Sequence, residues 1–107
     1  MVPTFTVLRS GPHQLSNTAA TLYTVPGSTT TTFRSITVTN TDSADRTFCL
    51  SIGTDDIGTR IFSETEIQAN KTAVIDGEWS LEAGEVIQAF ADVASKVNIT
   101  LNGFKKT

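Results

Sequence analysis

The sequence predicts an all-β protein: a single antiparallel β-sandwich, jelly-roll or immunoglobulin-like, with about eight short strands. Three observations predict this fold. Apolar and polar residues alternate with a period of two, and turn residues recur at short spacing. Threonine, whose branched side chain favours extended backbone, occurs 19 times in 107 residues. A chain of this length builds one core, so we expect one domain over residues 1–107.

The alternation is clearest in three segments. In "VNITLN" (97–102) and "SITVT" (35–39) each apolar residue is followed by Asn, Thr or Ser. In "TFCLSI" (47–52) Phe, Leu and Ile alternate with Thr, Cys and Ser. Such strands have one buried face and one polar, solvated face, which gives the threonines their place.

Turn signals recur at short spacing, among them Pro26-Gly27 and Asn102-Gly103. Asp76-Gly77 is the clearest predicted hairpin turn, because both residues tolerate positive φ. The segment 85–97 also fits helical spacing; we prefer a strand because Gly84 and the alternation after residue 96 bracket it. The predicted strands cover residues 4–9, 20–25, 32–40, 46–53, 59–67, 71–76, 85–91 and 96–104.

The N-terminal residues Val2, Pro3, Phe5 and Val7 form the candidate interface. They are either the first strand of the domain or an extended arm that adds a strand to a neighbouring subunit. We favour the strand, with residues 1–3 left as a short arm.

Charge and hydropathy argue against two classes of partner. The net charge is −3, and only Lys105 and Lys106 are adjacent among eight scattered basic residues, so we expect no nucleic-acid or anionic-membrane partner. No stretch approaches the ~20 apolar residues of a membrane span. The N-terminus lacks the basic start and apolar run of a signal peptide, so we expect synthesis in the cytoplasm.

The residue types of catalytic and metal sites are scarce. His13, the single histidine, lies in a predicted loop without a second His or a Cys for a metal site, and no Gly-x-Ser-x-Gly elbow is present. We therefore expect an ordinary surface residue. Cys49 is alone, so it forms no intrachain disulfide, and its strand context predicts a small buried hydrophobe.

Two acidic pairs are candidates for a cation or glycosidase site: Asp55-Asp56, and Glu64 with Glu66. Neither has the spacing of a known calcium loop, and a soluble turn is the simpler interpretation. We predict no catalytic residue, no metal, no cofactor and no enzyme. Trp79 and Tyr23 are expected to pack in the core; if exposed, they are the candidates for stacking on a ligand such as a sugar.

Two long segments carry a resemblance to a known family. "LYTVPGSTTTTFRSITVTNTDSADRTFCLSI" (22–52) resembles a Leu-Tyr-Thr-Val-Pro-x-Gly strand and turn followed by a strand ending in Thr-Asn. "WSLEAGEVIQAFADVASKVNITLNGF" (79–104) resembles a closing segment in which Leu-x-x-Gly-(Asp or Glu)-x-Ile precedes two strands. Both patterns belong to small structural proteins of tailed-bacteriophage virions. The matching positions are Leu22, Tyr23, Val25, Pro26, Gly27, Asn40, Leu81, Gly84, Ile87, Val97 and Gly103.

The resemblance, which spans residues 18–104, implies a non-enzymatic β-sandwich component of a virion. Its members include head decoration proteins and neck or tail accessory proteins. We favour a head decoration protein that binds the phage major capsid protein as a homo-oligomer, with a trimer favoured at positions of local threefold symmetry. The alternative is a neck, tail or fibre accessory protein with a glycan- or receptor-binding module.

Overall fold

Residues 2–107 are described in a computed structural model, which contains eight β-strands and one short 3-10 turn. All eight predicted strands are present, and the ambiguous segment after Gly84 is a strand. The elements are β1 (Phe5–Gln14), β2 (Ala20–Thr24), β3 (Thr30–Asn40), β4 (Arg46–Ile52), η1 (Ile57–Thr59), β5 (Arg60–Ile67), β6 (Thr72–Leu81), β7 (Val86–Ala91) and β8 (Val97–Lys106).

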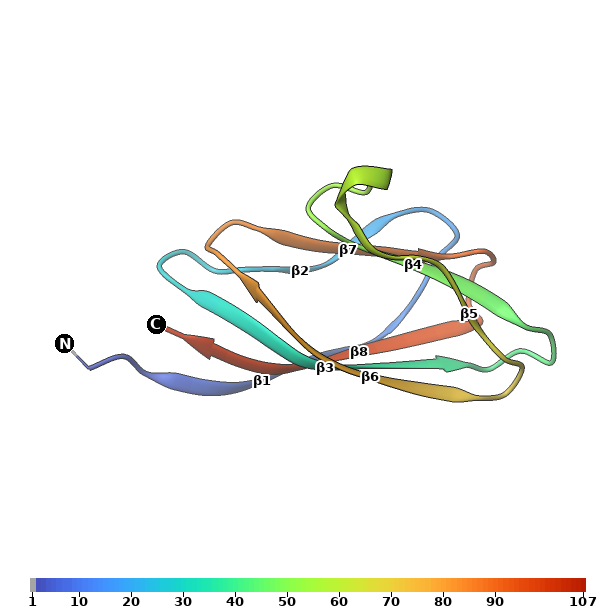
Figure 1. Ribbon diagram of the computed structural model, residues 1–107, viewed down its shortest axis with the longest axis horizontal. Coiled ribbons are helices and arrows are strands. Elements are labelled where there is room, and N and C mark those ends of the chain that lie inside the picture. The colour runs from blue at the N-terminus through green and yellow to red at the C-terminus, as the bar shows by residue number, and fades with distance from the viewer. Residues whose placement is uncertain (1) are drawn as a thin grey trace.

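The strands form two four-stranded antiparallel sheets that face each other (Figure 1). Sheet A has the order β1-β8-β3-β6, and sheet B has the order β2-β7-β4-β5. The first strand pairs with the last, the second with the seventh, the third with the sixth and the fourth with the fifth. This wrapped order is that of a jelly roll, so the predicted sandwich is confirmed and the jelly roll is the form it takes.

The core lies between the sheets and is made by the alternation seen in the sequence. In sheet A, Ile36 and Val38 of β3 lie beside Leu101 and Ile99 of β8, and all four are at most 1% exposed. Leu50 of β4 and its neighbours supply the facing layer of sheet B. Full burial of each such side chain stabilises the fold by about 1.5–3 kcal/mol relative to exposure.

Asn40, at the end of β3, is buried and fully hydrogen-bonded. Its Nδ2 donates to the carbonyl oxygens of Ala44 and Ile67, and its Oδ1 accepts from the backbone N–H of Asp42. A buried amide is tolerated only with such partners. Here it closes the β3–β4 connection and ties it to the end of β5.

Many threonines line the outer face of sheet A, as the alternation predicts. The hydroxyl groups of Thr39 and Thr72 lie 3.0 Å apart across β3 and β6, and those of Thr32 and Ser80 lie 3.1 Å apart. Cross-strand hydroxyl pairs stabilise a sheet. Thr31 differs, because it is fully buried and its hydroxyl lies 2.8 Å from that of Tyr23.

The expected polar face of β4 is not solvated, which corrects the simple two-faced interpretation. Ser51 is buried along with Phe48 and Leu50, beside Cys49, whose burial was expected. The reason is the connection from β4 to β5, residues 53–59, which folds over the outer face of sheet B (Figure 1).

The prediction of a hairpin turn at Asp76-Gly77 is wrong, since both residues lie inside β6. The register shifts here, so that Asp76 is opposite Ser35 while Trp79 is opposite Phe33. A Cβ on Gly77 would lie 2.6 Å from the Trp79 ring. The glycine therefore makes room for the indole at an irregularity in the strand.

Gly103 of β8 lies close against the backbone of β3. Phe33 is opposite Gly103 and Ser35 is opposite Asn102, so Arg34 is the extra residue of a bulge. A Cβ on Gly103 would lie 1.9 Å from the carbonyl oxygen of Thr32. The strands can pair at this distance only because residue 103 has no side chain.

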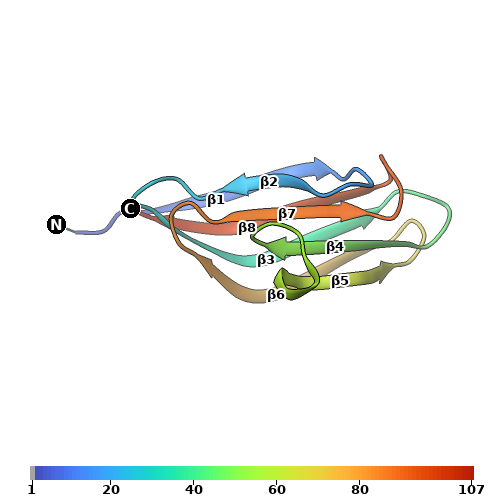
Figure 2. The ribbon, with the colours of Figure 1, turned by 90° about the horizontal axis from the view of Figure 1, so that it is seen from above.

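The molecule is elongated, with extents of 51 × 24 × 19 Å. The start of β1 and the end of β8 lie at the same end of the long axis (Figure 2). Within residues 2–107 no helix is long and apolar enough to cross a membrane.

Candidate interaction surface

The predicted interface residues lie on the first strand and just before it. Phe5 and Val7 belong to β1 rather than to a free arm, while Val2 and Pro3 precede the strand; Met1, the remaining residue of the expected arm, lies outside the described residues. The side chains of Val2, Phe5 and Val7 are 85%, 62% and 90% exposed. Since Leu8 packs against the core, Phe5 and Val7 point to the opposite, outer face of sheet A.

Phe104 of β8 completes this surface, although it was not predicted from the sequence. Val7 is directly opposite Phe104 in the β1–β8 ladder. The rings of Phe5 and Phe104 meet edge to face with centroids 5.9 Å apart. We name Phe5, Val7 and Phe104 the end patch. The signal was present in the sequence, because the outward positions 98, 100 and 102 are polar and the next, 104, is aromatic.

Basic residues surround the end patch. Arg9 follows Val7 on the same face of β1, and Lys106 is opposite Phe5 in the ladder. Lys105 precedes Lys106, and neither paired segment, 4–10 or 101–107, contains an acidic residue. These two paired segments therefore carry only basic charges, although the chain as a whole is acidic.

The outer edge of β1 carries unpaired main-chain groups. Thr4 and Thr107 exchange two main-chain hydrogen bonds, of 3.3 and 3.0 Å. Because bonded pairs alternate in an antiparallel ladder, Thr6 and Leu8 also bond to β8. The N–H and C=O groups of Phe5, Val7 and Arg9 therefore point away from β8, toward an edge on which residues 2–107 place no other strand.

The other aromatic candidates, Trp79 and Tyr23, are half-buried and packed. The Trp79 indole meets Phe62 edge to face at 5.9 Å, and the Tyr23 ring meets Phe33 in the same way at 5.3 Å. The Tyr23 hydroxyl bonds to Thr31. Both rings therefore help to join the two sheets, and their role as ligand-stacking residues stays a prediction.

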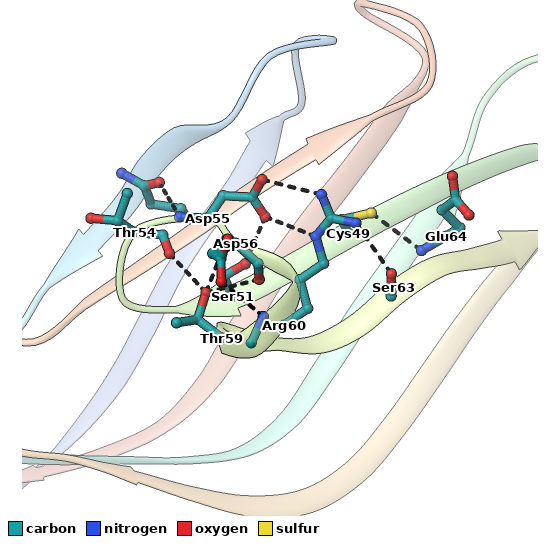
Figure 3. Close-up of polar contacts among 11 residues, drawn as sticks. Cys49, Ser51, Thr54, Asp55, Asp56, Thr59, Arg60, Ser63 and Glu64 are labelled. Atoms are coloured by element: carbon teal, nitrogen blue, oxygen red, sulfur yellow. Dashed lines mark hydrogen bonds and ion pairs between the residues drawn. The ribbon is translucent and has the colours of Figure 1, made fainter.

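The acidic pair Asp55-Asp56 builds the loop over sheet B (Figure 3). The Asp55 carboxylate accepts two hydrogen bonds from the Arg60 guanidinium, at 3.0 and 3.2 Å, and one from the Ser51 hydroxyl. Asp56 caps η1, accepting from the backbone N–H of Gly58. Arg60 also lies over the Phe90 ring at 5.3 Å.

These contacts have electrostatic consequences. Hydrogen bonds from Arg60 and then from Ser51 lower the pKa of Asp55, and the partner carboxylate raises the pKa of Arg60. The carboxylates of the second acidic pair, Glu64 and Glu66, accept no hydrogen bond from this cluster. The backbone N–H of Glu64 donates to Cys49 Sγ, and the charge of Glu64 adds to the rise in the pKa of Arg60. Among the residues from 2 to 107, no three His, Cys, Asp or Glu side chains come together as a metal site would require.

His13 lies in β1 and not in a loop, so its predicted position is wrong. It is half-buried, and its Nε2 lies 2.8 Å from the Ser10 hydroxyl. Burial lowers the pKa of His13. Cys49 is buried as a free thiol, as predicted. The described part of the chain, residues 2–107, forms no pocket.

No protein-family model and no curated protein matches this sequence. Solved structures share its fold. A Bacillus endospore appendage protein, of a family of disulfide-linked pili, is 11% identical with a TM-score of 0.54, over 99% of this chain and 87% of that chain. The Drosophila NLP core, studied for pentamer formation and histone binding, is 10% identical with a TM-score of 0.53, over 94% and 96%.

A pentameric capsid protein from metagenomic phage sequences is 14% identical over 96% of this chain and 61% of that chain. Its TM-score of 0.41 is too low to carry an argument. At 10–11% identity, the likeness to the endospore appendage protein and the NLP core is one of fold.

Proposed function

We propose that this chain is a non-enzymatic structural protein of a bacteriophage virion, a head decoration protein that binds the assembled shell as a homo-oligomer. The observation that carries the proposal is the end patch. Phe5 and Val7 are strongly exposed and lie beside Phe104. Exposed apolar side chains gathered on one surface mark a contact with another macromolecule.

The fold supports this role. A jelly roll whose core is filled and whose outer face is braced by paired hydroxyl groups is a stiff body with a contact surface at one end. The resemblance of residues 18–104 to small structural proteins of tailed-phage virions points to the same class of function. Synthesis in the host cytoplasm, followed by incorporation into the particle, completes the proposal.

The end patch is the surface proposed to dock on the major capsid protein. Its basic rim, formed by Arg9 and Lys106 on the same face, favours an acidic contact region on that partner. Because each copy contributes only a small apolar contact, tight attachment requires several copies acting together.

The first test is the copy number of this chain in purified particles of the phage that encodes it, measured by quantitative mass spectrometry. Abundance near that of the major shell protein supports a decoration protein. A few copies per particle would replace it with the neck, tail or fibre alternative, and absence from the particle would overturn the virion proposal.

The second test measures docking directly. Purified protein is added to particles that lack it, and bound protein is counted after sedimentation. We expect Phe5→Asp to lose binding while remaining folded. Val74→Asp is the matched control, because Val74 is 63% exposed, against 62% for Phe5, on the opposite edge strand of the same sheet. Normal saturation by Phe5→Asp would show that the end patch is not the docking surface.

A further inference from the structure

The two sheets have four edge strands, and three of them are poorly suited to pairing with another chain. β2 is five residues long and changes register between Thr21 and Tyr23. β5 is irregular against β4, and Glu64 within it has a φ of 47°. Short strands and irregular backbone are two ways in which proteins protect sheet edges.

On the β6 edge, the Asn40 N–H donates to the Lys71 carbonyl, which fixes the residue pairs of the β3–β6 ladder that are hydrogen-bonded. Because bonded pairs alternate, the main-chain N–H and C=O groups of Thr72, Val74 and Asp76 point outward, away from β3. Lys71, Asp76 and Glu78 place charges along this edge. Charged side chains are a further protection. The first half of β1 is the exception among the four.

The outward groups of β1 belong to Phe5, Val7 and Arg9, and the strand is regular from residue 5 to residue 10. Pro3, which has no N–H, precedes this window, and Pro12 follows it. The two prolines confine further pairing to a short window whose centre is Val7.

We propose that this edge pairs with the same edge of a second copy, antiparallel and centred on Val7. In this register Val7 is opposite Val7 of the second copy, and each Phe5 is opposite an Arg9. Three residue pairs then make about six main-chain hydrogen bonds, two for each pair. The two sheets A become one continuous eight-stranded sheet.

The side chains suit this pairing to a second copy of this chain. On the outer face, apolar Val7 meets its equivalent, and each Arg9 guanidinium meets a Phe5 ring, an attractive cation–aromatic contact. No two like charges are directly opposite. The nearest, Lys106 and the second copy's Arg9, are two strand spacings or about 10 Å apart, beyond the Debye length of ~8 Å at physiological salt.

The symmetry of the dimer has a consequence for docking on the shell. This consequence rests on the proposed function, whereas the pairing of the two copies does not. A twofold axis perpendicular to the sheet keeps both outer faces on the same side. The two end patches therefore join into one apolar row running from Phe104 through both Val7 residues to the second Phe104. The contact is twofold, so it predicts a dimer or a multiple of dimers where the sequence alone favoured a trimer.

An edge contact of this size is smaller than the ~1,200 Å² of a standard stable interface, so the dimer is expected to be weak. Analytical ultracentrifugation from about 1 to 500 µM should show the wild-type protein passing from monomer to dimer. Val7→Pro removes an outward N–H that β8 does not use, so the domain should fold while dimer affinity drops about tenfold or more. Val74→Pro, which removes an equivalent outward N–H on β6, is the control and should dimerise normally.

Opposite charges introduced at residue 7 of the two copies test the register of the pairing without using proline. Val7→Lys and Val7→Glu should each be monomeric, and their mixture should form heterodimers, because residue 7 meets residue 7 only in this register. Phe5→Asp should still dimerise through Arg9, which separates pairing from docking on the shell. The pairing would be overturned if the wild-type protein stayed monomeric or formed a trimer. It would also be overturned if Val74→Pro broke the dimer and Val7→Pro did not, or if the mixture of Val7→Lys and Val7→Glu remained monomeric.

Discussion

Replacing Gly103 by alanine tests the close packing of β8 against β3. The new Cβ would lie 1.9 Å from the Thr32 carbonyl oxygen, whereas Cβ atoms essentially never approach within 3.0 Å. β3 and β8 would have to separate by about 1 Å at this point, which breaks two or three ladder hydrogen bonds at about 1 kcal/mol each. Strain in the adjoining core adds to this. We expect a loss of about 3 kcal/mol or more, a large part of the stability of a domain of this size.

The measurement is urea unfolding at 25 °C, followed by circular dichroism. The control is Gly27→Ala, because a Cβ on Gly27 has no heavy atom within 4 Å and Gly27 is not among the positive-φ residues. Alanine there should be neutral or stabilise by less than about 1 kcal/mol. If Gly103→Ala unfolds within 1 kcal/mol of the wild type, the β3–β8 register given above cannot be right.

Two further changes test the core and the loop over sheet B. Leu101→Ala should lower the free energy of unfolding by about 3 kcal/mol, because Leu101 is fully buried. Thr100→Ala on the outer face should lower it by less than about 1 kcal/mol, and equal effects would contradict the assignment of residues 100 and 101 to opposite faces. Asp55 has a lowered pKa, so its carboxylate stabilises the fold above the unfolded pKa of about 4 and loses this effect as pH falls through the folded pKa. Urea midpoints measured from neutral to acid pH should therefore fall less steeply in Asp55→Asn than in the wild type, and identical slopes would contradict the role given to Arg60.

Alternation and turn signals together located all eight strands, although β1 and β6 run further than predicted. They failed where a tertiary contact decides the local structure. Asp76-Gly77 has the residue types of a tight turn, yet the Trp79 ring occupies the space over Gly77 and the strand continues. Likewise Ser51 on β4 was expected to be solvated, but the loop that carries its partner Asp55 covers it.

Two of the three end-patch residues, Phe5 and Val7, were among the interface candidates named from the sequence. Phe5 and Val7 were predicted because they are apolar residues near the start of the sequence. Their strand partner is about a hundred residues away, and period-two alternation does not show which strands pair. Phe104 therefore stayed unconnected to them. The open edge of β1 also depends on sheet order, which is set by how the whole chain wraps.

The pairing of β1 with β8 also fixes when the contact surface comes into being during synthesis. Residues 4–7 leave the ribosome before the rest of this domain, yet the strand that holds them in place is among the last segments of the domain to be made. Until residue 104 has been added, Phe5 and Val7 are part of a chain without its sheet, and Phe104 does not exist. Nascent chains consequently lack the assembled surface, and only a domain that has closed first strand upon last can present it to a partner.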